Sequence, residues 1–90
     1  MTIAWGPENA KLNFQKHKIR FSDAESVLFD PLALTQEDKD ADGEQRFISI
    51  GTDAFNRVLV VVYAFRGDKI RIIPARRATK KERKCYEERI

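Results

Sequence analysis

Residues 58–65 form an almost uninterrupted apolar run that is rich in valine. A run of this length and composition predicts a strand that is covered on both faces. Strand-like runs at 46–51 and 69–73 flank it, and only short segments separate the three. Because connections this short join neighbouring antiparallel strands, the sequence predicts a meander with residues 58–65 at its centre.

Three helices are predicted around this meander. The first, at about 7–18, opens with a proline, which suits the first position of a helix. Ser22 and Glu25 have the spacing of a capping box, which predicts the start of a second helix that ends before the next proline. Thr79 and Glu82 repeat this spacing and predict the start of the last helix.

The remaining segments are short. Residues 2–5 and 32–35 have the composition of brief strands, and the acidic stretch 37–44 is typical of a solvated loop. Pro74 has no backbone N–H to donate to a neighbouring strand. We therefore expect the pairing of the last strand to end at Pro74.

Together these elements predict an α+β fold, with helices packed on a four-stranded antiparallel β-sheet meander and a C-terminal helix. A chain of 90 residues favours a single domain, 1–90. No apolar run approaches the length of a membrane helix and no signal-peptide pattern opens the chain, so we expect a cytoplasmic protein without a membrane partner. The single cysteine, Cys85, excludes an internal disulfide and a cysteine metal cluster.

Charge is unevenly distributed along the chain. The net charge is +3, but ten basic and four acidic residues from Arg66 onward give that segment +6 and leave −3 on the rest. Clustered cations repel one another, and chains usually keep them where a polyanion binds. The segregation therefore favours nucleic acid as a partner, although a solvated helix face would produce the same pattern.

RNA can be cleaved without a metal. A base activates the 2′-OH for attack on the adjacent phosphate, an acid protonates the leaving 5′ oxygen, and fixed cations stabilise the phosphorane. The sequence has neither a cysteine–histidine cluster nor the acidic spacing of a magnesium site, so we expect no metal and no cofactor. Arg66, Arg71 and Arg76 lie on the last hairpin or just after it, and Arg46 lies on a neighbouring strand. We predict that these four stabilise phosphate; the alternative is that each is a separate surface residue.

Three other side chains suit proton transfer or RNA contact. His17 is the single histidine and follows Lys16, so it is a candidate general acid or base, or else a helix-end residue that bonds terminal carbonyls. Glu82 and Tyr86 share one helix face. Tyr86 could contact phosphate, stack on a base or transfer a proton, or it could anchor the last helix, and Glu82 could be only a cap.

Several spaced motifs resemble the BrnT family of bacterial type II toxins. They are Trp5-x-Pro7-x-Asn9-x-Lys11, Asn13-x-x-Lys16-His17, Phe21-x-x-Ala24, Asp30-Pro31, Glu44-x-Arg46 and Ile73-x-Ala75-Arg76-x-Ala78, followed by Glu82 and Tyr86. The resemblance covers essentially the whole chain. Two positions depart from the family pattern: Lys18 stands where glycine is usual, and Pro74 stands where serine is usual.

The resemblance implies a RelE-like fold and a metal-independent ribonuclease that blocks translation. It also implies a BrnA-type ribbon-helix-helix antitoxin that binds the toxin and represses their shared operon, so that operator DNA is bound only through the antitoxin complex. The matching family positions, taken as catalytic candidates, are Lys16, His17, Arg46, Arg66, Arg76, Glu82 and Tyr86. The candidates for holding the RNA are Arg71, Arg77, Lys80, Lys81, Arg83 and Lys84. Without the resemblance, a non-catalytic basic module that binds nucleic acid or a partner protein fits the composition equally well.

Overall fold

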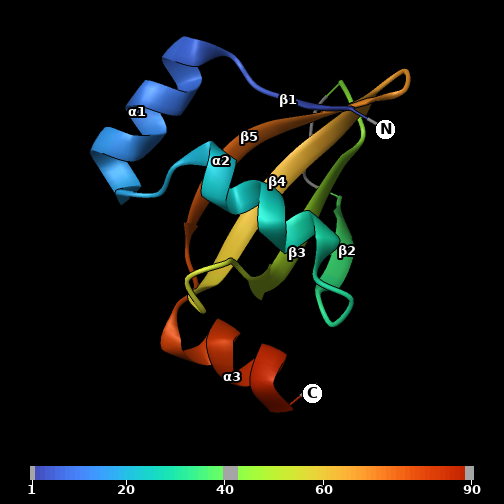
Figure 1. The fold of residues 1–90 in the computed structure, drawn as a ribbon. Coiled ribbons are helices and arrows are strands. Elements are labelled where there is room, and N and C mark those ends of the chain that lie inside the picture. Colours follow the sequence, from blue (N-terminus) through green and yellow to red (C-terminus); the bar gives the residue numbers. More distant parts are fainter. Residues whose placement is uncertain (1, 40–42, 89–90) are drawn as a thin grey trace.

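The computed structural model describes residues 2–39 and 43–88, and it contains one sheet with four helical segments (Figure 1). The elements in chain order are β1 (Thr2–Ala4), α1 (Pro7–His17), α2 (Phe21–Ala24), the 3-10 helix η1 (Glu25–Phe29), β2 (Leu34–Asp38), β3 (Arg46–Thr52), β4 (Val58–Arg66), β5 (Lys69–Arg77) and α3 (Lys80–Glu88). The predicted α+β class and the C-terminal helix are confirmed.

The sheet is larger than predicted and is mixed. Its strand order is β1-β5-β4-β3-β2, and β2 to β5 form the expected antiparallel meander. The prediction of four antiparallel strands is wrong because β1 adds a fifth strand parallel to β5, with Ile3 opposite Ile70. The outer edge of β5 would otherwise leave backbone donors and acceptors without partners, and this short segment supplies them.

The expected end of pairing at Pro74 is also wrong, since β5 continues to Arg77. Val61 pairs with Ala75 and Tyr63 pairs with Ile72, so two residues of β5 lie opposite one residue of β4. This is a β-bulge, and Pro74 is one of its two residues. A bulge accepts a residue without an N–H, because the regular ladder is already interrupted there.

Two helix starts were predicted from capping boxes, and one is correct. At α3, Thr79 N–H donates to Glu82 Oε1 at 2.8 Å and Glu82 N–H donates to Thr79 Oγ1 at 3.2 Å. The box at Ser22 does not form, because α2 already begins at the buried Phe21 and leaves Ser22 inside the helix. Burial of Phe21 in the core therefore decides this boundary.

Some element boundaries differ from their predicted positions. The strand predicted at 32–35 is β2, Leu34–Asp38, so the first acids of the stretch at 37–44 belong to a strand edge. Residues 40–42 of that predicted loop lie outside the described residues. The first helix matches its prediction and ends at His17, one residue early, because Lys18 takes the left-handed conformation of a C-cap.

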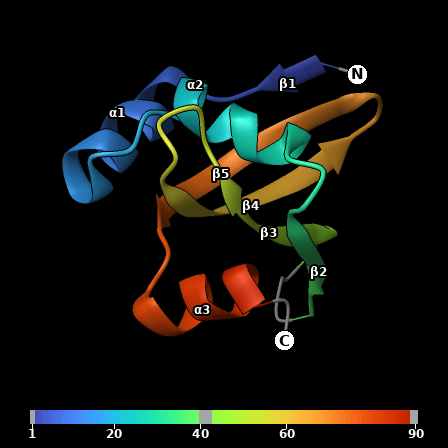
Figure 2. The same cartoon turned by 60° about the horizontal axis from the view of Figure 1, so that its bottom comes forward.

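The sheet has helices on both faces, and they differ in character. Figure 2 shows α1, α2 and η1 on one face and α3 on the other. The core lies between the sheet and the first group of helices, and its fully buried apolar side chains include Ile19, Phe21, Val27, Leu59, Val61 and Ile72. The opposite face is covered mainly by α3, which lies nearest to β3.

Candidate functional site

Four of the predicted arginines share the sheet face opposite α1 and α2. Side chains alternate along a strand, and Leu59, Val61 and Tyr63 of β4 point into the core. The even-numbered residues of β4, Arg66 among them, therefore point to the other face. Strand pairing and alternation place three more arginines there. We call this surface the arginine face; its arginines are Arg46, Arg66, Arg71 and Arg76.

Two of these arginines lie opposite each other across β4. Arg46 of β3 and Arg71 of β5 both lie directly opposite Ala64. Neighbouring strands are about 4.8 Å apart, so the two arginine backbones are separated by about 10 Å with only a methyl group between them. The two arginines thus carry their charge to the same face of the sheet, on either side of β4.

A carboxylate links two of these arginines. Glu44 lies 3.4 Å from Arg46 Nε and 3.3 Å from Arg66 Nη2. Arg46 Nε is buried and makes no hydrogen bond within the described part of the chain. The arrangement holds Arg46 and Arg66 together without using all of their donors.

The Arg76 side chain is fixed by two hydrogen bonds. Its Nη1 and Nη2 donate to the two carboxylate oxygens of Glu82 at 2.7 and 2.9 Å. The hydrogen bond with Arg76 lowers the pKa of Glu82 to about 2, and the N–H of Thr79 contributes in the same direction. The same pair raises the pKa of Arg76. Glu82 is therefore a fully ionised carboxylate at neutral pH, suited to holding a cation and poorly suited to transferring a proton.

Between the arginines the floor is apolar. A pocket of about 200 Å³ lies between the sheet and the start of α3. Its lining residues are Gln36, Ile48, Ile50, Val60, Val62, Pro74, Arg76 and Glu82. An apolar floor with a fixed guanidinium at its side can accept the flat face of a base next to a phosphate.

Lys16 and His17 lie beside β5. They line a pocket of about 250 Å³ whose other walls include Ile73 and Pro74. Pro74 lines this pocket and the one beside Arg76, so it separates the two and borders both. His17 is half-buried and Lys16 is exposed. These two candidates are thus near the arginine face, next to its β5 edge.

Tyr86 has partners on two other elements. Its hydroxyl donates to Asp30 Oδ2 at 2.5 Å and accepts from Thr52 Oγ1 at 2.8 Å. Asp30 Oδ2 also accepts the N–H of Thr52. These bonds tie α3 to the segment after η1 and to the end of β3, so Tyr86 anchors the last helix.

The predicted RNA-binding residues do not form one surface. Arg77 follows Arg76 and points to the opposite side of the sheet, since it pairs with Leu59. Arg77 and Arg83 line a separate pocket at the end of the sheet. Lys80, Lys81 and Lys84 are exposed on α3.

One buried polar residue was not singled out from the sequence as a structural element. Asn13 of α1 donates to the carbonyls of Ile19 and Ala75 at 3.0 and 2.8 Å, and it accepts the N–H of Ala75 at 3.0 Å. Its amide thus acts as a substitute strand partner for β5 beside the bulge. The sequence signal that could have indicated this role is a polar asparagine on the side of the helix that faces the core.

The described part of the chain lacks two kinds of feature. Residues 2–39 and 43–88 contain no helix that is both long and apolar enough to cross a membrane. The same residues contain no group of three or more histidine, cysteine or acidic side chains arranged to hold a metal ion.

The fold is that of a solved ribonuclease toxin. The crystal structure of the Brucella abortus ribonuclease toxin, BrnT, matches with a TM-score of 0.72 and 24% sequence identity, over 89% of this chain and 99% of that chain. The family described as "Ribonuclease toxin, BrnT, of type II toxin-antitoxin system" matches residues 5–82. The chain therefore belongs to the BrnT family of ribonuclease toxins of type II toxin–antitoxin systems. A comparison with curated protein sequences gave no match.

Proposed function

We propose that this protein cleaves RNA without a metal ion, with the arginine face as its active surface. The observation that carries the proposal is the position of Arg46 and Arg71 on either side of Ala64, on the same sheet face as the fixed guanidinium of Arg76. Permanent cations on one face stabilise a phosphorane better than its ground-state phosphate, because the phosphorane carries more negative charge.

Roles for the other candidates follow from their contacts. Glu82 is a positioning residue that holds Arg76, and Tyr86 is a positioning residue that holds α3 against the sheet. Arg66 supports Arg46 through their shared partner, Glu44.

Proton transfer is assigned to His17, with Lys16 beside it. His17 is the single histidine of the sequence and lies in the pocket at the β5 edge, and histidine is the side chain that enzymes use most often for proton transfer. A strand that lies across the arginine face passes the β5 edge at Pro74, where His17 can reach the 2′-OH or the leaving oxygen.

In the cell, we propose that the enzyme acts in the cytoplasm and blocks translation by shortening RNA. A type II system pairs such a toxin with a protein antitoxin. We propose a BrnA-type ribbon-helix-helix partner, with operator DNA bound only through the complex. Co-expression of the adjacent reading frame should restore growth that the toxin alone arrests. Growth that is unaffected by the toxin alone would contradict this proposal.

The site assignment is tested by substitutions that remove charge and keep part of the side chain. Arg46→Gln, Arg71→Gln and Arg76→Gln should each slow RNA cleavage by about 10²–10³-fold, the usual effect of losing one fixed donor to a transition state. The matched control is Arg20→Gln, which removes an exposed arginine that contacts Phe14 on α1. Equal losses in all four folded variants, or none, would remove the arginine face from the mechanism.

A further inference from the structure

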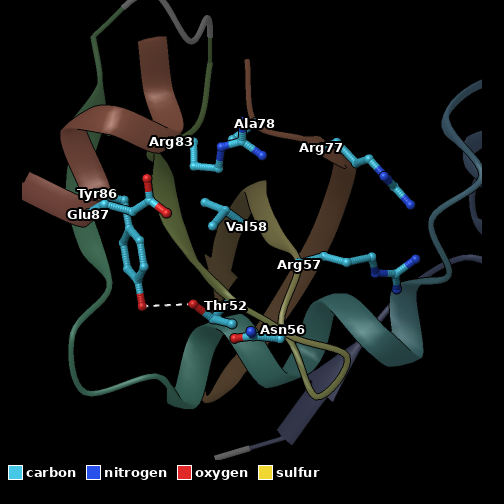
Figure 3. A pocket seen from close by; sticks show the side chains of 9 residues that line it. All are labelled: Thr52, Asn56, Arg57, Val58, Arg77, Ala78, Arg83, Tyr86 and Glu87. Carbon is cyan, nitrogen blue, oxygen red and sulfur yellow. Dashed lines mark hydrogen bonds between the residues drawn. The ribbon is translucent and has the colours of Figure 1, made fainter. Parts of the chain in front are cut away.

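A second basic pocket lies at the end of the sheet, away from the arginine face. It has a volume of about 370 Å³ and is enclosed by the β3–β4 connection, the end of β5 and α3. Figure 3 shows Arg57 and Arg77 on one side of the pocket and Tyr86 and Glu87 on the other, with Arg83 close to Glu87. Its lining residues are Thr52, Asn56, Arg57, Val58, Arg77, Ala78, Arg83, Tyr86 and Glu87.

The arginines of this pocket are in two different states. Arg57 is held by Asp53 at 2.6 Å and by Asp23 at 3.4 Å, so its charge is already compensated. Within residues 2–39 and 43–88, Arg77 and Arg83 take part in no ion pair, and both are exposed. Two guanidinium groups without an ion pair at the walls of one pocket attract an anion, and Glu87 offsets only one of them.

An exposed aromatic ring lies beside Arg57, at the border of the pocket. Phe55 belongs to the β3–β4 connection and is 67% exposed. Its N–H and that of Arg57 both donate to Asp53 Oδ1, at 3.0 and 2.9 Å, so the turn is rigid. The Arg57 guanidinium lies 5.2 Å from the centre of the Phe55 ring and fixes one of its faces. The ring is therefore presented to solvent with little conformational freedom left to lose on binding.

We propose that this pocket and Phe55 form a second RNA subsite, which holds one nucleotide outside the cleavage site. Arg77 and Arg83 bind its phosphate, and its base stacks on Phe55. Rigid aromatic rings next to arginines are the usual means by which proteins hold single-stranded RNA. The inference rests on the proposed function in taking RNA as the ligand, but it concerns different residues.

The chain connects the two sites directly. Arg76 and Arg77 are consecutive and point to opposite faces of β5, and Arg76 Nη1 also donates to the Arg77 carbonyl at 3.2 Å. An RNA strand that leaves the arginine face at Arg76 therefore meets Arg77 as it turns around the end of β5. The subsite would add affinity for long RNA and so favour it over short fragments.

The test is an equilibrium titration with a 2′-O-methyl oligonucleotide, which has no free 2′-OH and is not cleaved. Phe55→Ala should weaken binding about tenfold, as expected for the loss of one stacked base. Arg77→Gln should weaken binding and reduce the slope of log K against log salt by about 0.7, the value for one phosphate contact with a single strand. The control is Lys11→Gln, which removes an exposed cation of α1. Its effects on the affinity and on the salt slope should be clearly smaller than those of Phe55→Ala and Arg77→Gln.

Each outcome decides the inference. Wild-type affinity and salt slope in both folded pocket variants would overturn it, as would a wild-type protein that does not bind the oligonucleotide. If the pocket variants lose affinity for the antitoxin but not for the oligonucleotide, the pocket binds a protein partner, and the inference of an RNA subsite is overturned. Cleavage of ordinary RNA is measured separately, so a failure of the proposed ribonuclease site would be distinguished from a failure of the second subsite.

Discussion

Replacing Glu82 by glutamine tests whether its ion pair with Arg76 links the sheet to the last helix. The carboxylate accepts two hydrogen bonds from Arg76 and one from the N–H of Thr79. Glutamine keeps an oxygen that can still accept from Thr79, but it loses the charge. Comparison of Glu82→Gln with Glu82→Ala therefore separates the ion pair from the helix cap.

The magnitude follows from the pKa of Glu82, which falls from its ordinary 4.5 to about 2. A shift of this size corresponds to about 3 kcal/mol if solvent has no access. The Arg76 and Glu82 side chains are 39% and 28% exposed, so solvent screens the pair and we expect about 1–2 kcal/mol. Loss of the cap in Glu82→Ala should add about 1 kcal/mol.

The assay is urea unfolding as a function of pH. Because the folded protein holds Glu82 ionised at lower pH than the unfolded chain does, the stabilisation is complete above pH 4.5 and is lost as pH falls through about 2. Wild type and Glu82→Gln should thus differ at pH 7 and converge in acid. A difference that stays constant across this pH window would refute the ion pair as its source.

Three further predictions concern positions that hold the fold. Asn13→Ala should destabilise the protein by about 2–4 kcal/mol in urea unfolding, because buried backbone groups at Ala75 lose their partner; a loss under 1 kcal/mol would contradict this. Tyr86→Phe should cost about 1–3 kcal/mol by removing the hydroxyl shared with Asp30, and cleavage in that folded variant should persist if Tyr86 is an anchor. Lys18→Gly should stabilise the protein by about 0.5–1 kcal/mol, because Lys18 has a φ of 60° that glycine adopts more readily; thermal unfolding with no rise in Tm would refute this.

Local sequence signals predicted the elements that depend on local physics. The valine-rich run gave the central strand, and the Thr79 capping box gave the start of α3, because both depend on neighbouring residues. The box at Ser22 failed since burial of Phe21, a tertiary effect, sets that helix start. Likewise, the pairing of β1 with β5 joins segments far apart in the chain, and no local pattern encodes it.

For the candidate site, local sequence signals indicate which face some of the arginines occupy, but not the partners of the side chains on α3. Strand positions and hairpin pairing are enough to bring Arg46, Arg66 and Arg71 to one face. The bulge at Pro74 shifts the alternation of β5 by one residue, which puts Arg76 on that face and Arg77 on the other, and the sequence alone did not reveal the bulge. The partners of Glu82 and Tyr86 also depend on where α3 packs, so their positioning roles required the structure.

The most direct test of the account is the chemistry of the RNA ends produced in the presence of a chelator. Attack by the 2′-OH, assisted by the arginine face, leaves a 2′,3′-cyclic phosphate on one fragment and a 5′-OH on the other. The account predicts these ends, at an undiminished rate, with wild-type protein in EDTA. RNA that stays intact in EDTA, or fragments that carry a 5′-phosphate, would contradict it.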